Sequence, residues 1–492
     1  MKKEKIINII LISLLILFTI GNVEPRFQND TFFDIPIGKY ILENGIDMMD
    51  HFTWHTNLTY TYSHWLFGIV EAVLYDAFGF VGIYVMVLLI ASITSITIFI
   101  ILNKMGNNKI LSFFITILAV YIGAHAFAAR AQIITFLLFI IEFYCIEKLV
   151  ETNKNRYSII VIIISIIIAN IHASVWIISF IFYLPYIAEI IIWFVLNKLK
   201  MIKQDSKIII QKRNIKKLVI TMVITFFTGM VTPLGNVPYM FMYNNITGLS
   251  SEYIQELQSM KLIENYSILF LISMYIGILA FTKTKLKLTD GIYVLGFTLM
   301  SLEVVRSVFY LIFIGAIILT RLLTECFKQY NVKIFERIEK EILNKKRNAM
   351  FFTFIIVSIS LYGIFKQMPK EFVDVTQYPV EATQYILENV DINNMRIYNG
   401  FNYGSYLELK GIPAFMDSRS EVYCEEFNDT TVLKDVMKLE SGIVSYKDIF
   451  NKYDITHVLV PTTYIVNVYI EYDEEYKILY QDDAFVLYER IK

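Results

Sequence analysis

Two aspartates, Asp30 and Asp34, lie four residues apart in the first long polar segment of the chain. In a helix, residues at this spacing share one face, so the two carboxylates could share a proton or hold a divalent cation such as Mg²⁺ or Mn²⁺. Residues 32–42 form an amphipathic stretch that is compatible with such a helix. Asp also commonly caps helices, so a capping role for Asp30 is an equally open interpretation.

Further polar candidates lie where apolar segments end. They are Arg130, Asn170, His172, Glu252, Glu256 and Arg306. An ionisable group inside a membrane span costs about 2.5–3.5 kcal/mol on insertion scales, so such residues usually face a cavity or a partner. Asn170 and His172 are equally compatible with a hydrogen-bonded cluster at a helix turn. Arg306 is compatible with a position at the lipid headgroups.

The composition indicates that these residues are carried by a membrane protein. Hydrophobic residues make up 56% of the 492 residues and the mean hydropathy is +0.53, which exceeds what one soluble core could bury. A helix of about 20 apolar residues crosses a hydrocarbon core of about 30 Å. That length predicts about eleven spans, at 6–22, 78–102, 109–127, 131–150, 157–174, 175–197, 217–235, 265–283, 288–303, 304–323 and 349–367.

The distribution of positive charge predicts the orientation of these spans. With a cytoplasmic N-terminus, the inner segments carry about 27 Lys and Arg residues, and the outer loops carry only Arg26, Lys39, Arg130, Lys261 and Arg306. The same rule explains the basic loop 198–217 without a nucleic-acid partner. In this topology every polar candidate falls on the outer side, which suggests one shared site at the outer face of the plasma membrane.

Two outer segments are too long to be simple connectors. The first, 23–78, is expected to form short helices along the membrane interface. The second, 368–492, has short β-rich runs at 395–398, 405–409, 457–460, 477–480 and 484–488, separated by helix-compatible stretches such as 380–388. We therefore predict a mainly α, polytopic transmembrane domain over 1–367 and an extracytoplasmic α/β domain over 368–492.

Several short motifs along the chain resemble those of a known superfamily. They are Asn29-Asp30-Thr31-Phe32-Phe33-Asp34, Gly38, Gly45, Asp50-His51-Phe52-Thr53, His64-Trp65-Leu66, Arg130-Ala131-Gln132, Asn170-Ile171-His172-Ala173, Thr232-Pro233-Leu234-Gly235, Arg306, Tyr398-Asn399, Tyr403-Gly404, Tyr406-Leu407 and Asp417-Ser418-Arg419. Together they resemble bacterial membrane proteins related to the C-type glycosyltransferase (GT-C) superfamily. Many relatives have tryptophans in place of Phe32 and Phe33. His64 stands where a glutamate is common, so we assign no acid or base role to it.

The resemblance implies a GT-C-like fold and transfer of a sugar from a polyprenyl-phosphate donor to an acceptor at the outer face. Asp30 would then be the base or a metal ligand, with Asp34 beside it and His172 assisting. Arg130 and Arg306 would bind the leaving phosphate, since a guanidinium can bind two phosphate oxygens. Asn170 and Glu256 are further candidates for substrate binding. Asp417 and Arg419 are expected to form an ion pair or a turn and not a second active site.

Two other functions remain open from the sequence. A transporter or flippase would place ionisable groups within its spans, where Glu142, Glu189 and Glu303 are the exceptions to an otherwise uncharged interior. A non-catalytic component of surface polysaccharide assembly would use the C-terminal segment as a binding module. The sequence has no Walker phosphate loop, no Gly-rich dinucleotide motif and no H-E-x-x-H pair. ATP-driven, dinucleotide-dependent and zinc-protease functions therefore have no support.

Overall fold

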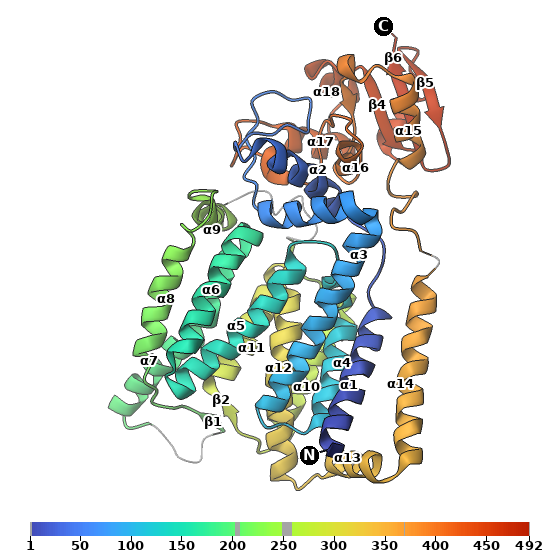
Figure 1. Cartoon of the computed structure of the whole chain (residues 1–492). Helices are drawn as coiled ribbons and strands as arrows, with labels where there is room; N and C mark the ends of the chain where they lie inside the picture. Colours follow the sequence, from blue (N-terminus) through green and yellow to red (C-terminus); the bar gives the residue numbers. More distant parts are fainter. Residues whose placement is uncertain (1, 202–206, 248–257, 369, 492) are drawn as a thin grey trace. The chain divides into compact units, whose positions relative to one another are not determined.

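The computed structural model describes residues 2–201, 207–247, 258–368 and 370–491 (Figure 1). The chain forms two compact units. The first comprises the described parts of Met1–Glu24, Tyr84–Phe241 and Ile254–Lys370, and the second those of Pro25–Ile83, Met242–Tyr253 and Glu371–Lys492. The first long loop and the C-terminal segment therefore fold within the same unit.

The first unit is a helical bundle. Its main helices are α1 (Lys2–Ile20), α3 from Tyr84 on (Trp65–Lys104 in full), α4 (Lys109–Ile122), α5 (Gln132–Thr152), α6 (Asn155–Ile171), α7 (Leu184–Lys198), α8 (Lys216–Thr228), α10 (Tyr266–Phe281), α11 (Leu288–Glu303), α12 (Val308–Gln329), α13 (Ile334–Asn344) and α14 (Lys346–Gln367). The helix α9 spans Val237–Thr247. A 3-10 helix, Ala173–Phe182, precedes α7, and a two-residue strand β1 (Ile208–Ile209) pairs in parallel with β2 (Leu286–Lys287).

Each of the eleven predicted spans coincides with helix in the structure. Within the described residues, four helical segments are long and apolar enough to cross a membrane by themselves: Trp65–Lys104, Ala173–Lys198, Val305–Gln329 and Lys346–Gln367. Shorter apolar helices include Lys5–Ile20, Lys109–Ile122, Asn155–Ile171 and Tyr266–Phe281. The prediction of a mainly α, polytopic membrane fold is confirmed.

Polar side chains join neighbouring helices inside this bundle. Along the contact of α6 with α8, Ser158 and Thr221 share a hydrogen bond of 2.6 Å, and Ser165 and Thr228 one of 2.7 Å. Trp176 donates its indole N–H to Ser165 at 2.9 Å. Such pairs favour close helix association where no water competes for the polar groups.

Three buried acidic residues of the first unit, Glu147, Glu189 and Asp290, are paired with arginines. Arg321 on α12 donates to Asp290 at 2.7 Å and also contacts Glu147 on α5. Glu189 on α7 accepts from Arg213 at 2.6 Å. Because each of these charges has a counter-ion within the protein, we interpret the pairs as fixed structural contacts.

The second unit combines helices with a four-stranded sheet. Its elements are α2 (Asn29–Asn44), the start of α3, α15 (Val380–Asn389), β3 (Ile397–Tyr398), α16 (Gly404–Leu409), α17 (Val432–Glu440), α18 (Tyr446–Lys452), β4 (His457–Pro461), α19 (Ile465–Ile470), β5 (Tyr476–Gln481) and β6 (Phe485–Arg490). The strand order is β3-β4-β6-β5. Strand β3 pairs in parallel with β4, and β6 is antiparallel to both β4 and β5.

One predicted strand is wrong. Residues 405–409 alternate in polarity as a strand would, yet they form the helix α16. The helix buries nearly all of its residues, Tyr406 and Leu407 among them, and packs against α2. The alternating pattern predicts a strand with one face in solvent, but this segment is buried on several sides, so the pattern does not apply to it. The strands predicted near 395, 457, 477 and 484 and the helix over 380–388 are confirmed.

Two glycines bring α2 and the start of α3 into backbone contact. A Cβ atom on Gly38 would lie 2.0 Å from the carbonyl oxygen of Gly68, and one on Gly68 would lie 2.9 Å from the carbonyl oxygen of Asp34. Real Cβ atoms do not approach backbone this closely, so both positions require glycine. This crossing fixes the position of Asp34 relative to the residues that open α3.

Candidate functional site

The residues that could do acid–base chemistry in the second unit gather around Asp34. Its side chain is 1% exposed, and neither carboxylate oxygen has a hydrogen-bond partner among the residues that the structure describes. The Nδ1 atom of His64 lies 3.8 Å from Asp34 Oδ1. Glu71 on α3 is fully buried and close enough for its charge to interact with those of Asp34 and Asp30. A buried carboxylate with free lone pairs is a strong candidate for a reacting group.

The surroundings change the proton affinity of this pair. Burial raises the pKa of Asp34 from 3.8 to about 6, the Asp30 charge acts in the same direction, and the His64 imidazole partly offsets both. Burial alone would lower the pKa of His64, but the Asp34 carboxylate more than offsets that effect and raises it. The protonation of each of these two side chains therefore depends on the charge of the other.

Asp30 lies one turn before Asp34 on α2 and is 8% exposed. The position preceding the helix is Gln28, so Asp30 belongs to the first turn and is not the cap residue. An acidic residue there also interacts favourably with the helix dipole. Among the described residues, no group of three or more His, Cys, Asp or Glu side chains could hold a metal ion. Asp30 and Asp34 alone do not make a complete ligand set.

A buried arginine lies at the centre of a second group of charges in this unit. Arg419 donates to Asp50 at 2.9 Å, to Glu408 at 3.0 Å and to Asp417 at 2.8 Å, and these four side chains are at most 1% exposed. Burial raises the pKa of Glu408 well above its usual range. Burial would raise the pKa of Asp417 as well, but the Arg419 charge more than offsets it and lowers that pKa. The expected ion pair of Asp417 with Arg419 is present, as part of a larger network.

Aromatic rings complete the enclosure of this arginine. The guanidinium carbon lies 4.8 Å from the ring centroid of Tyr60 and 5.2 Å from that of Phe52. These contacts favour the cation in a site from which water is excluded. Phe33, next to Asp34, has its centroid 6.0 Å from the same carbon, and the Arg419 charge lowers the proton affinity of Asp34. The arginine network and the Asp34 pair therefore act electrostatically on each other.

Hydrogen bonds between the first loop and the C-terminal segment hold this arrangement. Trp54 donates its indole N–H to the carbonyl of Ile397 at 2.9 Å, and its backbone N–H to Ala414 at 3.2 Å. The amide of Asn428 accepts from the backbone N–H of Thr59 at 2.8 Å and donates to its carbonyl at 2.9 Å. The indole of Trp54 therefore forms its hydrogen bond within the protein.

Backbone contacts in the C-terminal segment present Asp417. Asn399 donates to the carbonyl of Met416 at 2.7 Å and accepts from the N–H of Phe415 at 2.8 Å. A Cβ atom on Gly404 would lie 1.8 Å from the Met416 carbonyl oxygen, so only glycine fits there. These residues belong to motifs that the sequence singled out, and their role here is to shape the segment before Asp417.

In the first unit, three of the predicted site residues, Arg130, His172 and Arg306, lie around the start of α5. Arg130 immediately precedes the helix, and its carbonyl accepts from Ile133 at 3.0 Å. The guanidinium of Arg306 lies against the side-chain amide of Gln132. Buried His172 shares a hydrogen bond of 3.1 Å with Thr135. The N-terminus of a helix carries unpaired N–H groups and partial positive charge, so two arginines beside it form a setting suited to an anion.

The other two predicted substrate-binding residues are Asn170 and Glu256. Asn170, at the end of α6, donates to the carbonyls of Ile166 and Val231, at 2.8 Å each. This supports the interpretation of Asn170 as part of a hydrogen-bonded turn. Glu256, with Glu252, lies outside the described residues. Asp30 and Asp34 belong to one unit and the residues around α5 to the other, so their convergence on one site stays a prediction.

Sequence reasoning missed several members of the site. We assigned no acid or base role to His64 because a glutamate is common at this position in the proteins that the chain resembles. In the structure it lies beside the buried Asp34 carboxylate. Glu71 was missed because it is one acidic residue near an apolar helix. Asp50 and Arg419 lie 369 residues apart, and only the fold brings them together. The charge of Glu71 near a predicted span was the one signal that could have been followed.

The comparisons with known proteins identify the fold. No family model and no curated protein matches the sequence. The oligosaccharyltransferase AglB of Archaeoglobus fulgidus, solved with an inhibitory peptide and a dolichol-phosphate, matches 93% of this chain over 70% of its own, at 9% identity and a TM-score of 0.60. ArnT of Cupriavidus metallidurans, solved bound to undecaprenyl phosphate, matches 98% of this chain over 97% of its own, at 11% identity and a TM-score of 0.54. Both have the GT-C fold, so the fold predicted from the sequence motifs is confirmed.

Proposed function

We propose that this chain is a membrane glycosyltransferase that moves a sugar from a polyprenyl-phosphate donor to an envelope glycan, lipid or protein acceptor at the outer face. The fold is shared with proteins solved in complex with dolichol-phosphate and undecaprenyl phosphate. The observation that carries the proposal is the buried Asp34 carboxylate, whose oxygens accept no hydrogen bond from the described residues and which lies beside His64.

The proposed chemistry uses Asp34 as the general base. Its ionised carboxylate accepts the proton of an acceptor hydroxyl while the hydroxyl oxygen attacks C1 of the donor sugar. The bond from C1 to the phosphate oxygen breaks, and the polyprenyl phosphate leaves as an anion. His64 then takes up the proton from Asp34 or shares it, which restores the carboxylate. Asp30, one turn away on α2, supplies a second negative charge that keeps Asp34 a stronger base.

The leaving phosphate is stabilised best by positively charged groups that are already in place and do not have to move during the reaction. Arg130 and Arg306, beside the start of α5, are the candidates, with Asn170, His172 and Glu256 as further substrate contacts. A guanidinium binds two phosphate oxygens in a fixed geometry, which suits both donor binding and stabilisation of the leaving group.

A divalent cation, Mg²⁺ or Mn²⁺, also stays a prediction for this chain. Magnesium is commonly held by one or two carboxylates together with water and substrate phosphates, and Asp30 and Asp34 could supply those carboxylates. Among the described residues no group of three His, Cys, Asp or Glu side chains is placed to hold the ion, so water and substrate phosphate would have to complete its ligands.

The decisive experiment replaces each aspartate by its neutral isostere. We expect Asp34→Asn to lower transfer at least about 100-fold, since a positioned base contributes about 10²–10⁴-fold. Asp30→Asn should also lower it, and the exposed Asp429→Asn is the matched control. Transfer is measured as sugar incorporation into the cell envelope of a deletion strain that expresses each variant at equal membrane levels. Wild-type incorporation in Asp34→Asn would rule out this base, and an unaltered envelope in the deletion strain would rule out the transferase.

A further inference from the structure

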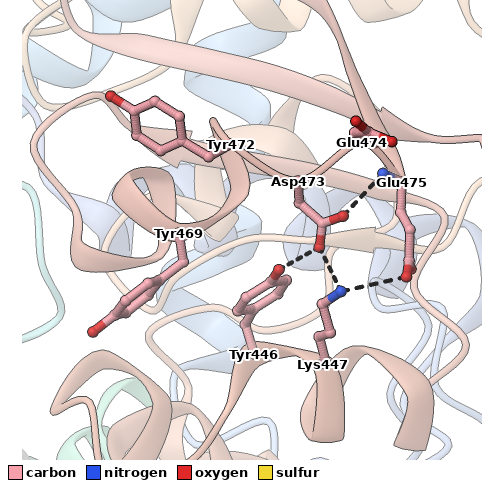
Figure 2. Close-up of a pocket in the computed structure, with 7 residues that line it drawn as sticks. All are labelled: Tyr446, Lys447, Tyr469, Tyr472, Asp473, Glu474 and Glu475. Carbon is pink, nitrogen blue, oxygen red and sulfur yellow. Dashed lines mark hydrogen bonds and ion pairs between the residues drawn. The ribbon is translucent and has the colours of Figure 1, made fainter.

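A pocket lies in the C-terminal part of the second unit, away from Asp34 in the sequence and built from different elements (Figure 2). It is an open cavity of about 540 Å³ formed by α18, the end of α19 and the turn that precedes β5. Ligand pockets commonly measure roughly 300–1,000 Å³. The proposed transfer reaction makes no use of this pocket.

One wall of the pocket is a fixed set of polar groups. Lys447 donates to Asp473 at 2.8 Å and to Glu475 at 3.3 Å, and the hydroxyl of Tyr446 donates to the same carboxylate of Asp473. The other Asp473 oxygen accepts from the backbone N–H of Glu475 at 2.9 Å. The Lys447 hydrogen bond, with that of Tyr446, lowers the pKa of Asp473 to about 2. These groups are held in place before any ligand arrives.

The opposite side of the pocket presents aromatic rings to solvent. Figure 2 shows Tyr469 and Tyr472 on one side and Lys447 and Glu475 on the other, with Asp473 between them. Tyr469 is 54% exposed and Tyr472 is 82% exposed. Neither hydroxyl bonds to another residue in the part of the chain that the structure describes. Covering exposed rings of this size with the apolar face of a ligand lowers the free energy of the complex.

The charges restrict the class of ligand. Asp473, Glu474 and Glu475 against the single Lys447 leave the pocket with an excess of negative charge, which disfavours phosphates, uronic acids and other anions. A cationic ligand would have to approach the Lys447 ammonium, which lies between the carboxylates. The remaining class is an uncharged ligand with many hydroxyl groups, which both donate and accept, and with an apolar face that can stack on tyrosine rings.

We propose that this pocket binds an uncharged saccharide, with the sugar face on Tyr469 and Tyr472 and the hydroxyls hydrogen-bonded to Asp473, Glu475 and Lys447. This is a binding site separate from the transfer site, and it requires neither donor nor turnover. It would hold a glycan of the envelope on the C-terminal part of the protein. The proposal goes beyond the transferase function and stands or falls independently of it.

Direct binding tests the proposal on the full chain in lipid nanodiscs. Three probes of equal length are compared by saturation-transfer NMR and by titration: maltohexaose as the neutral saccharide, hexagalacturonic acid as the anionic one and hexalysine as a basic peptide. We expect saturation transfer to maltohexaose only. Tyr472→Ala should weaken its binding about tenfold, the equivalent of one aromatic stacking contact. Asp473→Asn should weaken it as well.

The control variant is Leu387→Ala, an exposed apolar position on α15 that does not line the pocket. It should bind maltohexaose as the wild type does. Absence of saturation transfer to maltohexaose at millimolar concentration would overturn the proposal, as would unchanged binding by Tyr472→Ala. Preferential binding of hexagalacturonic acid or of hexalysine would also overturn it. The Asp34→Asn variant should retain binding, which separates this site from the transfer reaction.

Discussion

At the scale of single residues, the chain combines a carboxylate that is hard to ionise with a histidine that is easy to protonate. Burial raises the pKa of Asp34, whereas the Asp34 carboxylate raises the pKa of His64 against the opposite effect of burial. Had Asp34 been exposed, its pKa would have stayed near 4 and it would be a poor base. The pair therefore predicts a specific dependence of the rate on pH.

The rate of transfer should fall on the acidic side with a midpoint near pH 6, because Asp34 takes up a proton there and can no longer act as a base. His64→Asn removes the imidazole that lowers the pKa of Asp34, so the midpoint should move to higher pH. The measurement is kcat/KM against pH in proteoliposomes for both proteins. If His64 were only structural, the variant would lose activity equally at every pH and the midpoint would not move.

Arg419 should be among the residues most important for stability. Removing its guanidinium in Arg419→Leu leaves Asp50 and Asp417 as buried charges without a counter-ion, which commonly costs about 3–5 kcal/mol. Resistance of the purified protein to proteolysis and its thermal unfolding measure the loss. The matched control is Arg396→Leu, whose partner Asp454 is 80% exposed and which should change stability little. Equal stability of the two variants would contradict the structural role of the network.

At the scale of elements, the crossing of α2 with the start of α3 decides where Asp34 lies. A methyl group at position 38 would meet the backbone of Gly68, so Gly38→Ala must push the helices apart. We expect this variant to lose transfer activity and to unfold at a lower temperature. Gly277→Ala on α10 is the control, since nothing lies near its Cβ and alanine favours a helix. Wild-type activity of Gly38→Ala would show that the close crossing is not required.

The elements also show what a sequence can and cannot predict. The membrane helices could be located by length and hydropathy, because a span must satisfy its own backbone and so carries a local signal. The helix α16 could not, because its six residues are equally compatible with a strand until their burial against α2 is known. The Arg419 network was beyond reach for a further reason. Its partners Asp50 and Arg419 are distant in the chain, and no local pattern links them.

At the scale of the whole molecule, the chain is not divided where its membrane segments end. Residues 25–83 and 371–492 fold into one unit, joined by Trp54, Asn428 and the pair of Asp50 with Arg419. The first long loop therefore belongs to the second unit as fully as the C-terminal segment does. One consequence is that both pieces must lie on the same side of the membrane.

The positive-inside count assigns that side to the exterior, and cysteine labelling can test the assignment. In a background lacking the three native cysteines, Glu388→Cys on α15 of the second unit should react with a membrane-impermeant maleimide in intact cells. Lys328→Cys, 65% exposed at the end of α12, should react only after permeabilisation, because it belongs to a basic loop expected in the cytoplasm. Gln28→Cys, just before α2, should behave as Glu388→Cys does, since both positions belong to one unit. Labelling of Lys328→Cys in intact cells, with protection of Glu388→Cys, would reverse the topology and place the Asp34 site in the cytoplasm.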